Sequence, residues 1–140
     1  MNNIEQKVTH LKFIQDVVKR MADNSFKLKA WSTALVSAIM AIAEKVDQFY
    51  LLPMAGFILI LFWFLDAYFL RLENLYRDLY NHVRELDDVS PLAFDLNPYR
   101  KGVKHAKSAN IFSYVFSLTL WMFYGFLTLA ATGITVLAVW

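Results

Sequence analysis

The sequence predicts an all-α integral membrane protein with three transmembrane helices, an amphipathic N-terminal helix and a cytoplasmic extension of the second span. Of the 140 residues, 58% are hydrophobic and 16% are aromatic, which is more apolar surface than a small soluble domain can bury. Three weakly charged stretches approach or exceed the ~20 residues that a helix needs to cross a bilayer. The chain has no cysteine, so it offers neither a disulfide framework nor a thiolate metal site. We therefore expect a single membrane domain over residues 1–140.

Residues 1–24 predict the amphipathic helix. Apolar side chains recur there every three or four positions, at Ile4, Val8, Leu11, Ile14, Val18 and Met21. Such a helix can lie on the inner membrane surface, attracted by anionic lipid, or it can pack on the apolar stripe of a later helix. The sequence leaves both alternatives open. The run Asp23, Asn24 and Ser25 offers N-cap side chains, which indicates that a new helix begins there.

The first span is predicted at 26–47, around an uncharged run at 30–43. One stripe of this run is made of small residues that let helices approach closely: Ala30, Ala34, Ala38 and Ala41. A second stripe carries Thr33, Ser37 and Glu44. Ordinary helix packing explains both stripes better than a water-filled pore, although the second supplies candidate pore residues. A short turn at 44–48 should join this span to the next as an antiparallel hairpin.

The second span, at 49–70, continues without a helix breaker into a polar-faced helix. Pro53 falls in its first turn, where the missing N–H costs least. Beyond the span, an apolar stripe recurs at Tyr68, Leu72, Leu75, Leu79, Val83 and Leu86. The pairs Glu73 with Arg77 and Arg84 with Asp88 have the i,i+4 spacing of helical ion pairs. These features predict one helix that leaves the membrane and continues in the cytoplasmic segment 71–107.

The third span is predicted at 109–136, because residues 109–140 contain no charge. This length suits one long or tilted span and is too short for two spans with a turn. A polar stripe runs along it at Ser113, Ser117, Tyr124, Thr128, Thr132 and Thr135. Such a stripe in an apolar helix needs a partner or water. Ser117, Tyr124 and Thr128 are therefore the second set of candidate pore residues.

The distribution of basic residues predicts the orientation of the chain. Segments 1–29 and 71–107 hold thirteen of the fourteen Lys and Arg residues, whereas the first hairpin turn holds only Lys45. Because cytoplasmic loops of membrane proteins are enriched in Lys and Arg, the N-terminus is expected in the cytoplasm. Three spans then place Trp140 at the outer interface, where tryptophan is favoured.

Asp66 is an acidic residue inside the second span. Burying an unpaired carboxylate is costly, so it must have a partner or a function. The first alternative is a structural pair with Lys29 or with a hydroxyl of the first span, which its position near the cytoplasmic boundary favours. The second is a gate or an ion-selectivity role.

The segment 99–107 carries the most one-signed charge in the chain. Its basic residues, which could bind an anionic ligand, are Arg100, Lys101, Lys104, His105 and Lys107. Tyr99, Tyr76 or Tyr80 could stack on the bases of a single strand. The alternative, a topology signal that touches lipid headgroups, is the commoner role of such a segment.

Catalytic chemistry finds no support in the sequence. His82 and Glu85 form a lone i,i+3 pair, whereas a structural zinc site closes with four ligands. Neither a nucleophile elbow nor a zinc-protease or phosphate-loop pattern occurs. We expect no catalytic residue, no metal and no cofactor, and hence no enzyme.

Two stretches, NSFKLKAWSTALVSAIMAIA (24–43) and FWFLDAYFLRLENLYRDLYNHVR (62–84), carry a resemblance to a known group. They resemble small multi-pass membrane effectors of bacterial anti-phage defence, in which a partner nucleotidyltransferase makes a nucleotide signal. In one such group, the Hailong type, the enzyme makes single-stranded DNA oligomers that hold an oligomeric ion channel shut.

The resemblance implies a function and its partners. It implies a channel effector of the bacterial inner membrane, homo-oligomeric and tetrameric, that depolarises the cell. Its ligand would be single-stranded DNA or a cyclic nucleotide. Because three spans cannot enclose a water-filled pore alone, the residues also require a homo-oligomer for a channel. The alternative function is a non-channel membrane adaptor or assembly subunit.

Overall fold

The computed structural model describes residues 3–46, 51–86, 94–105 and 110–139, and these are all helix or irregular chain, without strands. The helices are α1 (Asn3–Val46), α2 (Leu51–Glu85), α3 (Phe112–Val115) and α4 (Leu118–Val139). Three of them, α1, α2 and α4, are long and apolar enough to cross a membrane. The predicted all-helical class with three candidate spans is therefore confirmed at this level.

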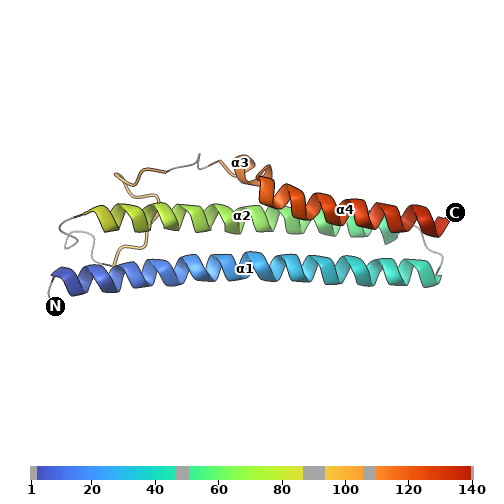
Figure 1. Cartoon of the computed structure of the whole chain (residues 1–140), viewed down its shortest axis with the longest axis horizontal. Helices are drawn as coiled ribbons and strands as arrows, with labels where there is room; N and C mark the ends of the chain where they lie inside the picture. The colour runs from blue at the N-terminus through green and yellow to red at the C-terminus, as the bar shows by residue number, and fades with distance from the viewer. Residues whose placement is uncertain (1–2, 47–50, 87–93, 106–109, 140) are drawn as a thin grey trace.

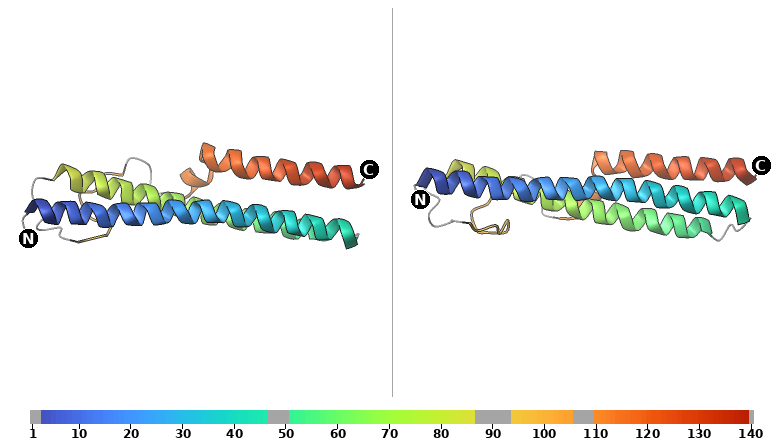
Figure 2. Two further views of the ribbon diagram at one scale, coloured as in Figure 1. Left: turned by 60° about the horizontal axis from the view of Figure 1, so that its bottom comes forward. Right: turned by 90° about the horizontal axis from the view of Figure 1, so that it is seen from below.

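Helices α1 and α2 run antiparallel and side by side along their whole length (Figure 1). Helix α4 lies beside only one half of this pair, the half that holds the end of α1 and the start of α2 (Figure 2). The other half carries the segment 94–105. The molecule thus has a three-helix half, which contains the apolar runs, and a two-helix half, which contains most of the charge.

The helix break predicted near residue 24 is not present in the structure. Helix α1 continues without interruption through Asp23, Asn24 and Ser25. The segment contains no glycine or proline, and Ser25 uses its hydroxyl to bond a side chain of α2 rather than to cap a helix. The predicted amphipathic helix and the predicted first span are one helix of 44 residues.

The apolar stripe of the N-terminal part of α1 packs on α2. Ile14 is fully buried against Leu79 and Val83, with Leu11 and Val18 packed around them. Of the two alternatives left open by the sequence, the structure places this stripe in a helix–helix interface. Ile4 and Val8, nearer the N-terminus, stay exposed.

The hairpin between α1 and α2 begins later than expected. Helix α1 continues to Val46, so Glu44 and Lys45 are helical, and residues 47–50 lie outside the described chain. Helix α2 then runs from Leu51 to Glu85 as one piece, with Pro53 in its first turn, as predicted. The pair Glu73 with Arg77 is formed at 2.6 Å, whereas Asp88 lies outside the described residues.

The predicted third span is broken into two helices at Phe116 and Ser117. Tyr114 and Val115, on α3, are buried in the same hydrophobic cluster as the start of α4. The Val115 carbonyl, close to the break, accepts a hydrogen bond of 2.9 Å from the indole N–H of Trp63 on α2. A tertiary contact therefore satisfies a carbonyl at the point where the helix turns.

The segment 94–105 folds back onto α1. The predicted turn at Asn97 is confirmed, because the Asn97 side chain accepts the backbone N–H of Tyr99 at 3.0 Å. His10, which is 1% exposed, places its Nε2 3.0 Å from the Asp95 carbonyl. The Phe94 ring lies against His10 at 6.2 Å. The turn signal predicted at Ser90 and Pro91 falls outside the described residues.

Candidate functional site: a buried polar cluster between three helices

Asp66 lies at the centre of a polar cluster in the three-helix half. Its side chain is fully buried and forms an ion pair with Lys29 of α1, with 2.5 Å between Oδ2 and Nζ. The Ser25 hydroxyl donates to its other carboxylate oxygen. Lys29 also donates to Ser25 at 2.8 Å and lies 5.9 Å from the centre of the Phe123 ring on α4. The expected ion pair between Asp66 and Lys29 is formed, whereas the hydroxyl partner, Ser25, lies just before the predicted first span.

Tyr124 brings α4 into the same cluster. Its side chain is fully buried, and its hydroxyl donates to the Phe62 carbonyl at 3.3 Å. The same hydroxyl lies near the side chains of Ser32 and Asp66. The Tyr124 ring stacks on Trp63 with 5.9 Å between centroids and 7° between planes. One tyrosine therefore connects the buried charges of α1 and α2 to the third helix.

The cluster satisfies its charges internally. A carboxylate buried alone in an apolar interior costs several kcal/mol, and an ammonium partner with further hydrogen bonds offsets that cost. Lys29 and Asp66 sum to zero charge, and Ser25 and Tyr124 supply the remaining contacts. This arrangement holds helices in register, and it contains no exposed acidic group that could act alone on a passing ion.

The other candidate pore residues divide between two surfaces. Thr33 and Ser37 are exposed on the outer face of α1, and Thr33 bonds its own helix through the Lys29 carbonyl at 2.9 Å. Ser117, like Tyr124, faces inward, and its hydroxyl is buried without a hydrogen-bond partner among the described residues. The side chain of Glu44 lies outside the described part of the chain. The two predicted stripes therefore do not face one common space within a single chain.

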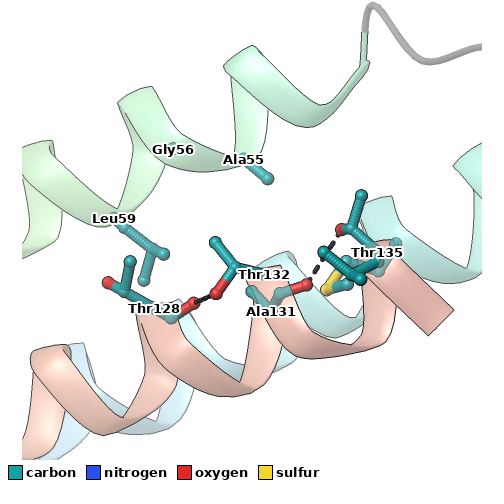
Figure 3. Close-up of a pocket in the computed structure, with 9 residues that line it drawn as sticks. Ala55, Gly56, Leu59, Thr128, Ala131, Thr132 and Thr135 are labelled. Atoms are coloured by element: carbon teal, nitrogen blue, oxygen red, sulfur yellow. Dashed lines mark hydrogen bonds between the residues drawn. The ribbon is translucent and has the colours of Figure 1, made fainter.

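Thr128 lines a groove of about 260 Å³ between α4 and the α1–α2 pair. Figure 3 shows Ala55, Gly56 and Leu59 of α2 facing the threonines of α4 across it. The threonine hydroxyls donate to carbonyls of their own helix: Thr128 to Tyr124, Thr132 to Thr128 and Thr135 to Ala131. The groove therefore presents methyl and methylene groups, although the threonines on its α4 side form a polar stripe in the sequence.

Two of the candidate anion-binding residues in 94–105 already contact acidic side chains. Arg100 binds Asp95 at 2.6 Å. Hydrogen bonds from the Asn97 backbone and from Arg100 hold the pKa of Asp95 below its usual value. His105 lies 3.5 Å from the Asp78 carboxylate. Two further members, Lys101 and Lys104, are exposed on the same segment, and Lys107 lies outside the described residues.

The aromatic residues suggested as stacking faces differ in access. Tyr99 is 54% exposed, whereas Tyr76 and Tyr80 pack against the buried cluster that contains Ile14 and Leu79. A base could therefore reach the ring of Tyr99 more easily than the other two. Tyr99 also accepts a hydrogen bond of 3.1 Å from Arg71.

Sequence reasoning missed two members of the buried cluster. Ser25 was assigned to a helix cap, and Tyr124 to a stripe facing a pore or a partner. Both are explained by the position of Asp66, because they are hydroxyls at its level on neighbouring helices. In the described residues, no group of three or more His, Asp or Glu side chains is arranged to hold a metal ion.

In the part of the chain that the structure describes, the fold and this cluster consist of three helices suited to a membrane and a buried ion pair between two of them. No protein-family model, no curated protein and no solved structure matches the chain.

Proposed function

We propose that the chain is the subunit of a homo-oligomeric membrane channel in which α1 faces the central axis. The observation that carries the proposal is the outer face of α1 in the three-helix half. This face is exposed and consists of small or hydroxylated residues: Ala30, Thr33, Ala34, Ser37, Ala38 and Ala41. Such a face suits close contact with another helix or with water better than contact with lipid.

Helix α1 also exposes Trp31, Leu35 and Ile42 in this half, so its small residues form a stripe on the exposed surface rather than all of it. The other two long helices have exposed faces of a different kind. They carry bulky apolar side chains that suit lipid: Phe57, Ile60 and Phe64 on α2, and Trp121, Phe126 and Leu129 on α4. If copies of the chain assemble, contact through α1 leaves these bulky faces outward. Thr33 and Ser37 would then line the axis, while Asp66 and Lys29 hold each subunit together behind it.

The ligand of the proposed channel is an anionic nucleotide or single-stranded oligonucleotide in the cytoplasm, and its role is control of conductance during anti-phage defence. The support from the described residues is the exposed pair Lys101 and Lys104 beside the exposed ring of Tyr99. A phosphate bound there would lie on the segment that precedes α3 and α4 in the chain. Arg100 and His105 would have to exchange their acidic neighbours for the ligand.

Ion flux from liposomes that contain only the purified chain tests the proposal. We expect flux from the wild type, a change of flux when a single-stranded oligodeoxynucleotide is added inside, and loss of flux in the double variant Thr33→Leu with Ser37→Leu. Thr119→Leu is the matched control, because Thr119 is an exposed threonine of α4. Unchanged flux in the double variant, or a monomer in lipid nanodiscs, would contradict a pore along α1.

The alternative function, a non-channel adaptor, rests on the same small outer face of α1. A helix of a different membrane protein could pack there as well as a second copy. A tight bilayer together with a stable hetero-complex would favour the adaptor. Cross-linking through a cysteine placed at Ala34 separates the two functions, since the channel requires the chain to cross-link to itself.

A further inference from the structure

Arg71 is the first basic residue of α2 after the apolar run, about 7.5 Å of helix rise beyond Asp66. Its Nη2 donates to the Tyr99 hydroxyl at 3.1 Å, and its Cζ lies 6.0 Å from the centre of the same ring. Its Nε is buried and has no hydrogen-bond partner among the described residues. None of the ion pairs formed in the described chain involves Arg71. A partly buried guanidinium is thus held in place by an aromatic ring and has no described carboxylate to balance its charge.

Asp78, an acidic residue further along α2, is engaged elsewhere. Asp78 directs its carboxylate at His105, with 3.5 Å between Oδ2 and Nδ1. The His105 ring in turn lies 6.4 Å from the ring of Tyr99. Tyr99 therefore lies between Arg71 and His105, and the acid that faces His105 has that residue as a partner.

The level of Arg71 along the helices matches a membrane boundary. Tyr114 of α3 lies within electrostatic range of both Arg71 and Asp78, so α3 packs at this height. On either side of it, Phe112 and Phe116 are 58% and 71% exposed, and α4 begins two residues later. Exposed phenyl rings beside the start of an apolar helix suit contact with lipid, whereas Arg71 is the first basic residue of α2 beyond its apolar run.

We propose that Arg71 and Tyr99 bind a phosphate group at this boundary, supplied by a phospholipid headgroup or by free phosphate. The planar guanidinium can donate to two phosphate oxygens at once, and its hydrogen bond to Tyr99 uses Nη2. Its Nε–H is covered by the surrounding chain, so a phosphate would approach the Nη groups. The Tyr99 hydroxyl accepts from Arg71 and retains its own proton to donate to a third oxygen. This site is independent of any pore and involves none of the five basic residues of the proposed oligonucleotide surface as a direct ligand.

The test measures the thermal unfolding midpoint of the full chain in dodecyl maltoside, which contains no phosphate. Three probes are added separately: dihexanoylphosphatidylglycerol, dihexanoylglycerol with the same tails but no phosphate, and inorganic phosphate. We expect the phospholipid to raise the midpoint and the diacylglycerol to leave it unchanged. A rise with the phospholipid alone assigns the site to a headgroup, and a rise with inorganic phosphate as well assigns it to the phosphate itself.

Variants locate the effect. Arg71→Gln should weaken the apparent affinity about ten- to a hundredfold, because it removes a charged hydrogen-bonding group. Lys45→Gln removes an exposed charge at the opposite end of the helix pair and should leave the affinity unchanged. If Arg71→Gln does not fold, Arg71→Lys and Tyr99→Phe replace it, and each should weaken binding while keeping the helical content. The proposal is overturned by an equal rise with dihexanoylglycerol, by full affinity in the folded Arg71 variants, or by no rise with any phosphate probe.

Discussion

The two ends of α4 are held in different ways. Near its start, Leu120 and Tyr124 are buried, and Tyr124 stacks on Trp63 and bonds the Phe62 carbonyl. Further along, α4 is separated from α2 by a groove, and its threonines bond only their own helix. In a membrane, lipid is as apolar as the side chains, so burial alone gives little force for helix association. The difference shows that a few polar contacts at one end position this helix.

The largest expected effect concerns the Lys29–Asp66 ion pair, which lies beside the start of α4. Lys29→Met leaves the buried Asp66 carboxylate without its cation, which should cost about 3–5 kcal/mol of unfolding free energy. The double variant Lys29→Met with Asp66→Leu should recover most of that loss, because apolar replacements of a whole buried pair are often neutral. Both are measured by sodium dodecyl sulfate titration of the protein in dodecyl maltoside. Equal losses in the single and double variants would show that the pair is not the anchor.

A smaller effect compares one hydroxyl at each end of α4. Tyr124→Phe keeps the stacked ring and removes the hydroxyl that contacts α2, at an expected cost of about 1–2 kcal/mol. Thr132→Val removes a hydroxyl that bonds only within α4, and should change stability by less than about 0.5 kcal/mol. The same detergent titration measures both. A Thr132 variant as damaging as the Tyr124 variant would remove the contrast between the two ends.

The smallest expected effect concerns the groove. A Cβ added at Gly56 has no atom within 4 Å, so Gly56→Ala should fit without displacement and stabilise α2 by about 0.5–1 kcal/mol through its helix propensity. The control is Gly125→Ala, where the added Cβ would lie 3.9 Å from the Trp121 ring near the start of α4. Circular dichroism during thermal unfolding measures the two variants. A loss of stability at Gly56 would mean that another helix occupies the groove in the assembled protein.

The features that the sequence predicted well follow from local rules or from strict physical demands. The long α2 and its Glu73 with Arg77 pair follow from helical periodicity and i,i+4 spacing. The partner of Asp66 was predictable because a carboxylate in an apolar run needs a cation at its own height, and Lys29 met that condition. Membrane burial makes such pairing nearly obligatory.

The features that the sequence did not predict depend on contacts between distant residues. No local sequence signal marks the break at Phe116, because neither glycine nor proline lies there. A hydrogen bond from Trp63 to the Val115 carbonyl helps to satisfy the backbone at this point. The signal at Asp23 was real as a cap motif, but continuous packing of α1 on α2 overrides it. The docking of His10 on the Asp95 carbonyl joins residues 85 positions apart and leaves no trace in the sequence pattern.

The unbroken α1 has a mechanical consequence. At 1.5 Å per residue, its 44 residues form a rod about 66 Å long without a glycine or proline joint. His10 fixes one end of this rod to the segment 94–105, and the small outer face near Ser37 lies at the other. Because α1 contains no glycine or proline at which it could kink, the contact at His10 and the small outer face near Ser37 belong to one continuous helix.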